Sequence, residues 1–363
     1  MKKWRVGIIG ATGMVGQRFI GLLHQHPWFD ITVLAASGRS AGMRYEEALA
    51  SRWAMPFSLP QSVKDVVVMD ASDISSIKPL VDFVFCAVSM TKAETRALEE
   101  AYAKADIPVV SNNSACRMVP DVPMVIPEIN ASHLDVLEQQ KKRLGSNKGF
   151  IVVKPNCSIQ SYVPALTPLL SFGIKQISVC TYQAVSGAGK TLETWPEMQD
   201  NVIPYIGGEE EKSEQEPLKV WGNVSKDGLS IEHAQTPVIS AQCLRVPVSD
   251  GHMAAVSVKF ERKPTIDEMK KLWQSMETEP QRLKLPSAPA PFLQYFEEDN
   301  RPQTKLDRDM AGGMGISIGR LREDSIFDYR FVCLSHNTLR GAAGGGLLTA
   351  ELLCAKGLIP KGE

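Results

Sequence analysis

Glycines recur at every third position directly after the first apolar segment of the chain, at Gly10, Gly13 and Gly16. The segment Arg5 to Ile9 is expected as a buried strand, and apolar residues recur at helical spacing between Val15 and Leu23. Glycine permits the tight turn between strand and helix and lets a phosphate approach the backbone at the helix N-terminus. The pattern predicts the first βα unit of a nucleotide-binding sheet, although a glycine turn without a ligand has the same spacing.

Alternating strands and helices continue this pattern through the first half of the chain. The helix-like segment Lys92 to Lys104 lies between two of the strands, and alternation of this kind indicates a parallel, doubly wound sheet. The segment Ser132 to Leu144 is expected as a solvated helix. The later strands are expected at Ile31 to Ala36, Val66 to Met69, Phe83 to Val88, Val109 to Ser111 and Phe150 to Val153.

The second half of the chain has a different pattern, with strands that alternate polar and apolar residues as in an antiparallel sheet. These strands are expected at Gln176 to Val185, Ser240 to Val248, Met253 to Glu261, Gly315 to Leu321 and Asp328 to Ser335, and 286–301 is expected as a loop region. A final helix, Leu339 to Ala355, is expected to return to the nucleotide domain.

The predicted fold class is therefore α/β: a Rossmann-type doubly wound parallel sheet plus a second α+β domain with a largely antiparallel sheet. Residues 1–150 with 337–363 are expected to form the dinucleotide-binding domain and residues 151–336 a second domain, which the family resemblance given below implies is the catalytic and dimerisation domain. A chain of 363 residues is long enough for two domains.

The composition excludes several classes of function. The 40 Lys and Arg residues nearly balance the 41 Asp and Glu residues, without a charge run that indicates nucleic acid or a membrane surface. The seven cysteines include no C-x-x-C pair, which argues against a disulfide framework and a structural metal site. No segment has the length of a transmembrane helix, and glycines interrupt the apolar N-terminal run, so a cytoplasmic protein is expected.

The end of the second strand indicates which nucleotide is bound. Sites for NAD usually have an acidic residue there, which binds the ribose 2′-hydroxyl. This strand instead runs into Ser37, Gly38, Arg39 and Ser40. A cation and two hydroxyls suit a 2′-phosphate, so NADP is the expected cofactor, unless Arg39 is a solvated loop arginine.

The segment from Lys154 to Gln160, Lys-Pro-Asn-Cys-Ser-Ile-Gln, follows an expected strand and precedes a helix-like run. The helix N-terminus is expected to lower the pKa of the Cys157 thiol toward the nucleophilic thiolate. A buried core cysteine is the alternative on this stretch alone. His252 follows the turn signal Asp250-Gly251, and by itself is either an acid/base or a loop histidine.

Together these motifs resemble those of aspartate-β-semialdehyde dehydrogenase, over nearly the whole chain. The resemblance rests on Gly10 to Gly16, Pro155 to Ser158, Gln183 with Ser186 to Gly189, Glu209-x-x-Lys212, and Arg245 shortly before Asp250 to His252. The segment Gly208 to Lys212 and the long 190–220 region are similar to the archaeal and fungal branch. Lys154 departs from the pattern, since Asn is expected there, and Pro164 and Pro168 predict a short or kinked helix after Cys157.

The resemblance implies reversible, NADP-dependent reduction of aspartyl phosphate to aspartate semialdehyde with release of phosphate, in lysine, threonine and methionine synthesis. It implies Cys157 as the nucleophile that forms a thioester, His252 as the acid/base, and Gln183 as the group that orients the acyl intermediate. It implies a homodimer or homotetramer, and it leaves open which of Glu209, Glu210 and Glu211 faces the substrate.

The remaining expected site residues bind substrate or cofactor. Substrate carboxylate, ammonium and phosphate are expected to contact Arg245, Glu209, Lys212, Arg117 and Asn156. Cofactor is expected to contact Gly10, Ala11, Thr12, Gly13, Met14, Val15, Ser37, Arg39, Ser40, Ser186, Gly187, Gly189 and Asn337.

Three alternatives remain from sequence. Malonyl-CoA reductase shares this architecture and thiol chemistry, and N-acetyl-γ-glutamyl-phosphate reductase is a more distant relative. A catalytically silent nucleotide-binding regulator is the alternative from a different class, but such a chain is expected to have lost at least one of Cys157, Gln183, Arg245 and His252.

Overall fold

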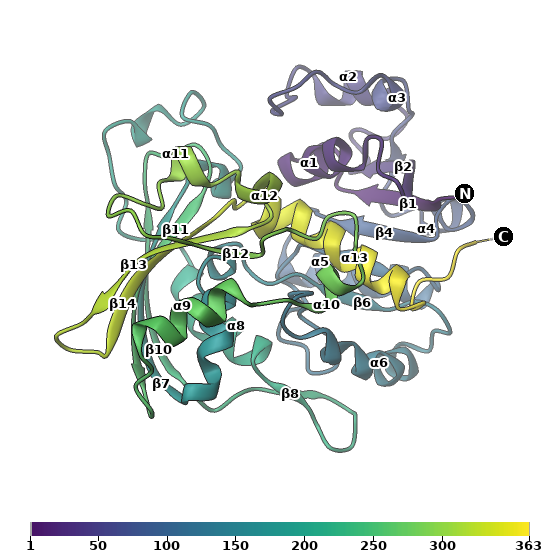
Figure 1. The fold of residues 1–363 in the computed structure, drawn as a ribbon. Helices are drawn as coiled ribbons and strands as arrows, with labels where there is room; N and C mark the ends of the chain where they lie inside the picture. Colours follow the sequence, from purple (N-terminus) through teal and green to yellow (C-terminus); the bar gives the residue numbers. More distant parts are fainter. Residues whose placement is uncertain (1, 363) are drawn as a thin grey trace.

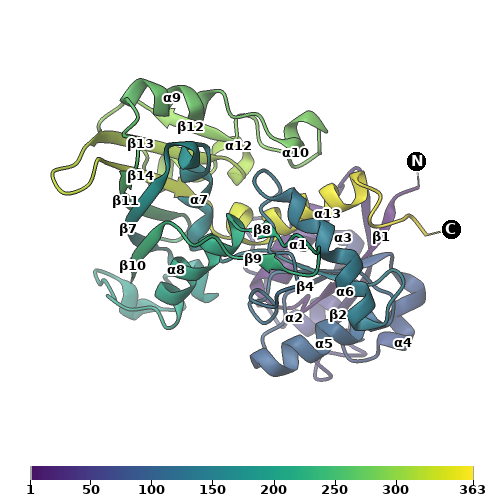
Figure 2. The same cartoon turned by 90° about the horizontal axis from the view of Figure 1, so that it is seen from below.

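The computed structural model describes residues 2–362, which form two sheets with helices around and between them (Figures 1 and 2). The first sheet has the strand order β3-β2-β1-β4-β5-β6, and every neighbouring pair in it is parallel. Its order reverses between β1 and β4, which is where open α/β sheets bind ligands. Its strands are β1 (Trp4–Ile9), β2 (Phe29–Ala36), β3 (Met69–Asp70), β4 (Phe83–Cys86), β5 (Val109–Ser111) and β6 (Ile151–Val153).

Both faces of this sheet are buried, because successive strand residues point to opposite sides and helices cover each side. Phe83 and Phe85 of β4 join the apolar cluster that contains α1 and α13, whereas Val84 joins the cluster that contains α5. The helices around this sheet are α1 (Met14–Leu23), α2 (Tyr45–Leu49), α3 (Gln61–Lys64), α4 (Ile74–Ile77), α5 (Lys92–Lys104), α6 (Leu137–Leu144) and α13 (Gly344–Ala355).

The second sheet has the order β10-β7-β11-β14-β13-β12. Its three central pairings are antiparallel, while β10 with β7 and β12 with β13 are parallel. Its strands are β7 (Ile174–Gln183), β10 (Val238–Arg245), β11 (His252–Phe260), β12 (Leu293–Phe296), β13 (Ile316–Glu323) and β14 (Tyr329–Ser335). Other elements of this half are β8 (Asn223–Val224), β9 (Ile231–Glu232), α7 (Val163–Leu166), α8 (Glu209–Val220), α9 (Ile266–Gln274), α10 (Glu279–Arg282), α11 (Thr304–Asp307) and α12 (Met310–Gly313).

The fold class is thus the predicted one, a parallel doubly wound sheet with a second, largely antiparallel sheet. The last helix returns to the first sheet, as expected: it begins with a π-helical turn, Leu339–Ala343, and its leucines lie in the same apolar cluster as Phe85 and Val110. Near the chain ends, the Trp4 indole N–H donates to the carbonyl of Ile359 over 3.1 Å.

Several expectations need correction. β6 pairs with β5, so the first sheet extends beyond the expected domain boundary at residue 150; the domain division itself stays a prediction. The strand predicted at Val66 to Met69 is shorter than expected. It overlaps the two-residue β3 (Met69–Asp70) only at Met69, and Val67 forms an isolated bridge with Arg44. The expected loop at 286–301 contains β12. β7 lies between β10 and β11 in the second sheet.

The helix expected to be solvated at 132–144 is also different. It consists of a 3₁₀ helix, Ala131–Val136, followed by α6, and its side chains His133, Leu137, Gln140 and Leu144 are buried. Gln140 explains why a polar sequence is buried here, because its side chain bonds the backbone of both Asp121 and Ile151. Charged residues occupy the other side of the helix.

Candidate active site

Cys157 lies directly beyond β6, where the chain passes from the first sheet toward the second. The Asn156 side-chain oxygen accepts from the backbone N–H of Ser158 over 2.7 Å, which closes a tight turn around the cysteine. Three short helices follow, Ser158–Gln160, α7 and Thr167–Phe172, and the last two each have a proline in their first turn. The prediction of a short or kinked helix is therefore confirmed.

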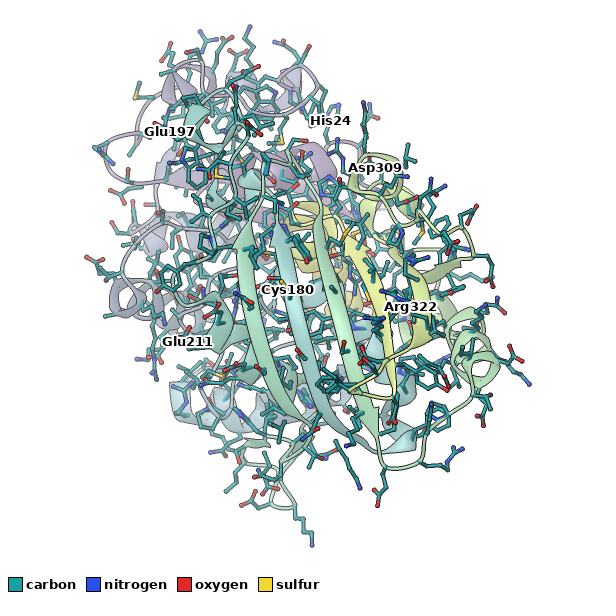
Figure 3. All side chains as sticks on the ribbon, turned by 90° about the vertical axis from the view of Figure 1, so that its left-hand side faces the viewer. His24, Cys180, Glu197, Glu211, Asp309 and Arg322 are labelled. Atoms are coloured by element: carbon teal, nitrogen blue, oxygen red, sulfur yellow. The ribbon has the colours of Figure 1, made fainter. Side chains whose placement is uncertain are left out.

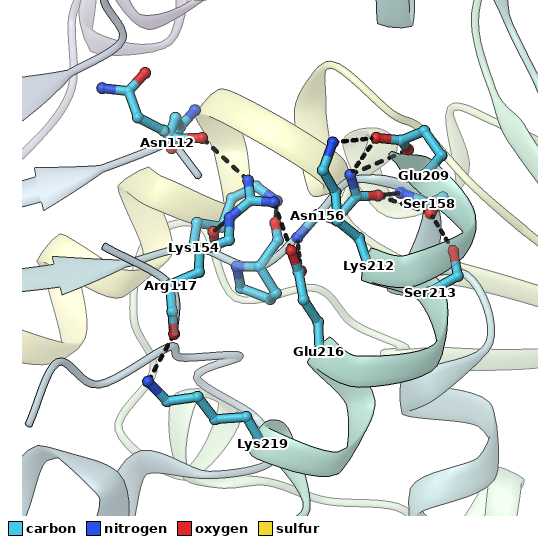
Figure 4. A network of polar contacts seen from close by, with 12 residues as sticks. Asn112, Arg117, Lys154, Asn156, Ser158, Glu209, Lys212, Ser213, Glu216 and Lys219 are labelled. Carbon is cyan, nitrogen blue, oxygen red and sulfur yellow. Dashed lines mark hydrogen bonds and ion pairs between the residues drawn. The ribbon is translucent and has the colours of Figure 1, made fainter. Parts of the chain in front are cut away.

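One face of α8 lies against this turn, as Figure 4 shows. Glu209, Lys212, Ser213 and Glu216 occur at the i, i+3, i+4, i+7 spacing of one helix face. The helix begins at Glu209 because Gly208 takes a left-handed conformation, with φ of 70°.

Glu209 is the acceptor for three side chains of the site. Lys212 Nζ donates to it over 2.7 Å, Asn156 Nδ2 over 3.0 and 3.1 Å, and Gln183 Nε2 over 3.3 Å. Glu210 instead accepts the backbone N–H of Cys243, and Glu211 is exposed. Glu209 is thus the one of the three carboxylates that bonds other predicted site residues, and its contact with substrate stays a prediction.

Glu216, which the sequence interpretation missed, connects two predicted site residues. One carboxylate oxygen accepts Arg117 Nη1 over 2.8 Å and the other accepts the backbone N–H of Asn156 over 2.6 Å. Arg117 also donates to the carbonyls of Lys154 and Asn112, which leaves two of its five N–H donors without a protein acceptor among the described residues. The seven-residue spacing from Glu209 was the available signal for Glu216.

Gln183, Arg245 and His252 come from three neighbouring strands. Gln183 ends β7, Arg245 ends β10 directly beside it, and His252 begins β11. Gly187 lies between Arg245 and His252: a Cβ added there would be 2.9 Å from Arg245 Nη1 and 3.0 Å from His252 Nε2. Glycine at this position therefore lets both groups approach, because a Cβ here would make them shift.

The tautomer of His252 follows from its hydrogen bonds. The backbone N–H of Ala184 donates to Nδ1 over 3.0 Å, so the neutral ring carries its proton on Nε2. Nε2 is buried and has no partner in the part of the chain that the structure describes. Burial, and then the Arg245 charge, lower the pKa of His252 to about 3. His252 is therefore a neutral donor at neutral pH.

The Cys157 thiol departs from expectation in one respect. Burial, followed by the Glu209 carboxylate, raises its pKa, although Lys154, Arg117 and Arg245 act in the opposite direction. The prediction of a lowered pKa from a helix N-terminus is wrong because the first helix after Cys157 has only three residues, too few for a substantial dipole.

A cavity of about 1370 Å³ lies over the glycine turn and extends to the second sheet. Its lining includes Thr12, Gly13 and Met14 from the first domain and Gly189, Asp250 and His336 from the second half.

The glycine turn itself fits a dinucleotide. A Cβ on Gly10 or Gly16 would lie 2.4 or 2.3 Å from backbone oxygen, whereas one on Gly13 meets only Gly10 oxygen at 3.5 Å. The turn is thus tightly packed on its inner side and open at Gly13, as a pyrophosphate requires.

The other predicted cofactor residues lie in different surroundings. Ser37, Arg39 and Ser40 form the turn after β2, where Arg39 is exposed, and none of them lines the cavity. Asn337 bonds the backbone N–H of Gly251 and the Ser186 hydroxyl, each over 2.8 Å. Asn337 thus connects the Ser186 and Gly251 loops. Ala11 is buried and Val15 is partly buried.

Two family models match the chain in sequence. The semialdehyde dehydrogenase NAD binding domain matches residues 5–137, and the semialdehyde dehydrogenase dimerisation domain matches residues 166–340. The fold and the site thus define a semialdehyde dehydrogenase.

Known relatives narrow this class. An aspartate-semialdehyde dehydrogenase of Archaeoglobus fulgidus is 44% identical over 98% of this chain and 100% of the relative. One of Aspergillus fumigatus is 40% identical over 98% of this chain and 99% of the relative. The crystal structure of aspartate semialdehyde dehydrogenase with NADP from Candida albicans superimposes with a TM-score of 0.89 at 38% identity, covering 99% of this chain and 100% of that chain. The chain belongs to the aspartate-semialdehyde dehydrogenase family, and the resemblance to archaeal and fungal members is confirmed.

Proposed function

We propose that the protein converts L-aspartyl 4-phosphate to L-aspartate 4-semialdehyde, reversibly and with NADP, through a thioester on Cys157. This reaction supplies lysine, threonine and methionine synthesis. The carrying observation is the convergence of five side chains from separate elements: Cys157, Gln183, Glu209, Arg245 and His252.

In the oxidative direction, the Cys157 thiolate adds to the aldehyde carbon and a C–S bond forms. NADP⁺ accepts the hydride when it is bound. His252 donates its Nε2 proton toward the substrate oxygen while charge develops there, and takes it back as the carbonyl re-forms. Phosphate then attacks the thioester carbon, the C–S bond breaks, and the thiolate leaves with the electron pair.

The charged ends of the substrate find matching groups around Cys157. Arg245, whose side chain has one acceptor among residues 2–362, the Ala184 carbonyl at 2.7 Å, grips the α-carboxylate. Glu209 accepts the α-ammonium. Lys212 and the free donors of Arg117 bind phosphate, and Asn156 and Gln183 orient the acyl group.

The NADP site is formed by the glycine turn, which takes the pyrophosphate at Gly13, and by the Ser37–Ser40 turn, which takes the 2′-phosphate through Arg39. The absence of an acidic residue at the end of β2 supports a preference for NADP over NAD.

No group of three His, Cys, Asp or Glu side chains within residues 2–362 is arranged to hold a metal ion, and no helix there is long and apolar enough for a membrane span.

The functional unit is a homodimer or a tetramer built from such dimers, in the cytoplasm. The second sheet has an open face whose partly exposed apolar residues are Leu244, Tyr182, Met253, Cys180, Ala255 and Val332, with Gln242, Ser178 and Ser257 on the same face. Figure 3 shows these strands with no helix in front of them. A partly apolar sheet face that none of the elements within residues 2–362 covers suits a second copy, and the match to a dimerisation domain over 166–340 supports this assignment.

One assay tests the function: reduction of NADP by aspartate semialdehyde, with and without phosphate. The expected result is turnover that depends on phosphate. The kcat/KM for aspartate semialdehyde should be well above the kcat/KM for malonyl-CoA or N-acetyl-γ-glutamyl phosphate, which are measured in the reverse direction as substrates for reduction. A better rate with malonyl-CoA would assign the substrate pocket to that reductase. Cofactor binding without any turnover would identify a silent regulator.

A further inference from the structure

Lys154 is a buried lysine whose charge has little compensation. Its side chain follows β6, is 3% exposed, and donates from Nζ to the carbonyl of Pro155. Among the described residues no carboxylate lies within ion-pair distance of it. An ammonium group has three N–H donors, so a single acceptor leaves this charge short of partners.

Lys219 is the contrasting case. It is equally buried, but its Nζ donates to the carbonyls of Arg117, Val119 and Val122 over 2.6, 2.8 and 2.9 Å. Three acceptors satisfy the three N–H groups, so Lys219 is a structural lysine. Lys154 lacks such a set of acceptors, so a structural role does not explain its burial. The family motif also has Asn, not Lys, at this position.

Glycines of the last helix show what lies beside Lys154. A Cβ added to Gly341 would be 2.9 Å from Cys157 Cβ, and one added to Gly345 would be 3.2 Å from Lys154 Cδ. Gly341 and Gly345 are about one turn apart, and positions at this spacing lie roughly 5–6 Å from each other. The Lys154 side chain and Cys157 thus lie next to each other along one side of this helix.

The charged groups around the pair come from several elements. Arg117, Cys157, Glu216 and Arg340 face Lys154, whereas Glu209, Lys154, Arg117 and Arg245 face Cys157. Burial, and then the Arg117 charge, lower the pKa of Lys154 to about 7. Lys154 is therefore mostly charged at pH 6, half charged near pH 7, and mostly neutral at pH 9.

We propose that the Lys154 ammonium is a positioning charge that stabilises the thiolate of Cys157 and sets the pH range in which this cysteine reacts. The thiol proton leaves to solvent, and Lys154 keeps its own. Lys154 lies within electrostatic reach and makes no hydrogen bond to Cys157 among the described residues. The inference rests on the proposed role of Cys157 as the nucleophile.

The test measures alkylation of Cys157 by iodoacetamide in the full-length protein between pH 6 and pH 9, with mass spectrometry of the peptide that contains Cys157. In Lys154→Met the rate at pH 6 should fall about tenfold or more, since one unit of thiol pKa changes the thiolate fraction tenfold. The difference should narrow toward pH 9, where Lys154 of the wild type has lost its charge. Lys154→Gln should lower the alkylation rate as Lys154→Met does. Lys154→Arg should have the wild-type alkylation rate at pH 6, and at pH 9 its rate should still be supported by the charge, which arginine does not lose.

Lys219→Met is the matched control: it should lower the melting temperature and leave the pH profile of Cys157 unchanged. Equal rates for Lys154→Met and wild type at pH 6, or a reduction by the same factor at every pH, would overturn the proposal.

The alkylation readout is independent of turnover, so the two proposals fail separately. An active wild type with a Lys154-independent profile refutes the inference alone. A wild type without activity, in which alkylation still depends on Lys154, refutes the proposed function alone.

Discussion

Cys157 and Cys180 are the two cysteines of the seven that are partly exposed, but the residues around them differ. Cys157 faces Arg117, Lys154 and Arg245, whereas Cys180 lies on the open face of the second sheet. Cys157→Ala should abolish turnover and leave the melting temperature and NADP binding intact, because it removes only the nucleophile. Cys180→Ala should keep the wild-type kcat. More than a few per cent of residual activity in a clean Cys157→Ala preparation contradicts the assignment.

His252 should also be detectable through stability. Its pKa is about 3 in the folded chain and about 6.5 when unfolded, so the unfolded state binds one more proton between these values. Folding stability is therefore lost as the pH falls from about 6.5 toward 3. His252→Asn should reduce the slope of unfolding free energy against pH by up to about 1.4 kcal/mol per pH unit. Denaturant titrations between pH 4 and 6 measure it, and an unchanged slope contradicts burial of a neutral ring.

Activity gives a second readout for the same residue. His252→Asn should lower kcat by about 10²–10⁴-fold, the usual contribution of a positioned proton donor. A change confined to KM would make His252 a binding residue.

Arg39 is the residue on which cofactor choice depends. Arg39→Ala should raise KM for NADP much more than KM for NAD, since only NADP has the 2′-phosphate. Steady-state kinetics with both cofactors measures this. Equal effects on the two cofactors contradict a contact between Arg39 and the phosphate.

At the scale of elements, α8 gathers the polar groups of the site on one face. Glu209→Gln should weaken semialdehyde use by about 1.5–3 kcal/mol in kcat/KM, the range for a hydrogen bond to a charged group. Glu211→Gln, two residues along the same helix but exposed, should leave kcat/KM unchanged. Equal effects of the two variants, or none, would show that this face of α8 does not contact substrate.

Local patterns in the sequence were sufficient for several elements. α5 matches its predicted bounds at Lys92 and Lys104, and Thr91 and Glu94 form a capping box at its start. The same signal, Thr265 with Glu268, marks the start of α9 and was overlooked. β12 was missed because four residues of an edge strand, among prolines and charges, carry too short a pattern.

Such local patterns could not predict how segments that are distant in sequence pair or pack together. The insertion of β7 between β10 and β11 depends on pairing between segments more than sixty residues apart, which no local spacing records. Glu216 and Lys154 share this limitation, because their roles follow from neighbours brought together by the fold. The pKa of Cys157 was mispredicted for a related reason, because burial and the Glu209 carboxylate, both consequences of the fold, raise it.

At the scale of the whole molecule, the open face of the second sheet should decide the oligomeric state. Ala255 lies at its centre, between Cys180 and Val332, so Ala255→Arg should place a charge in the proposed dimer interface. Sedimentation velocity should then show a monomer, or a dimer weakened many-fold. Ile326→Arg, at an 80% exposed loop position, is the control and should keep the wild-type assembly. An unchanged assembly in Ala255→Arg excludes this face as the interface.

The return of the last helix to the first sheet has a consequence for synthesis on the ribosome. α13 covers the side of the sheet that Phe85 and Val110 face, and its leucines Leu347, Leu348, Leu352 and Leu353 are buried there. At roughly 5–20 residues per second, the strands of this sheet emerge many seconds before the helix that covers them. The sheet that is translated first therefore cannot finish folding until α13 has been made, and its apolar face has to be shielded from aggregation in the meantime.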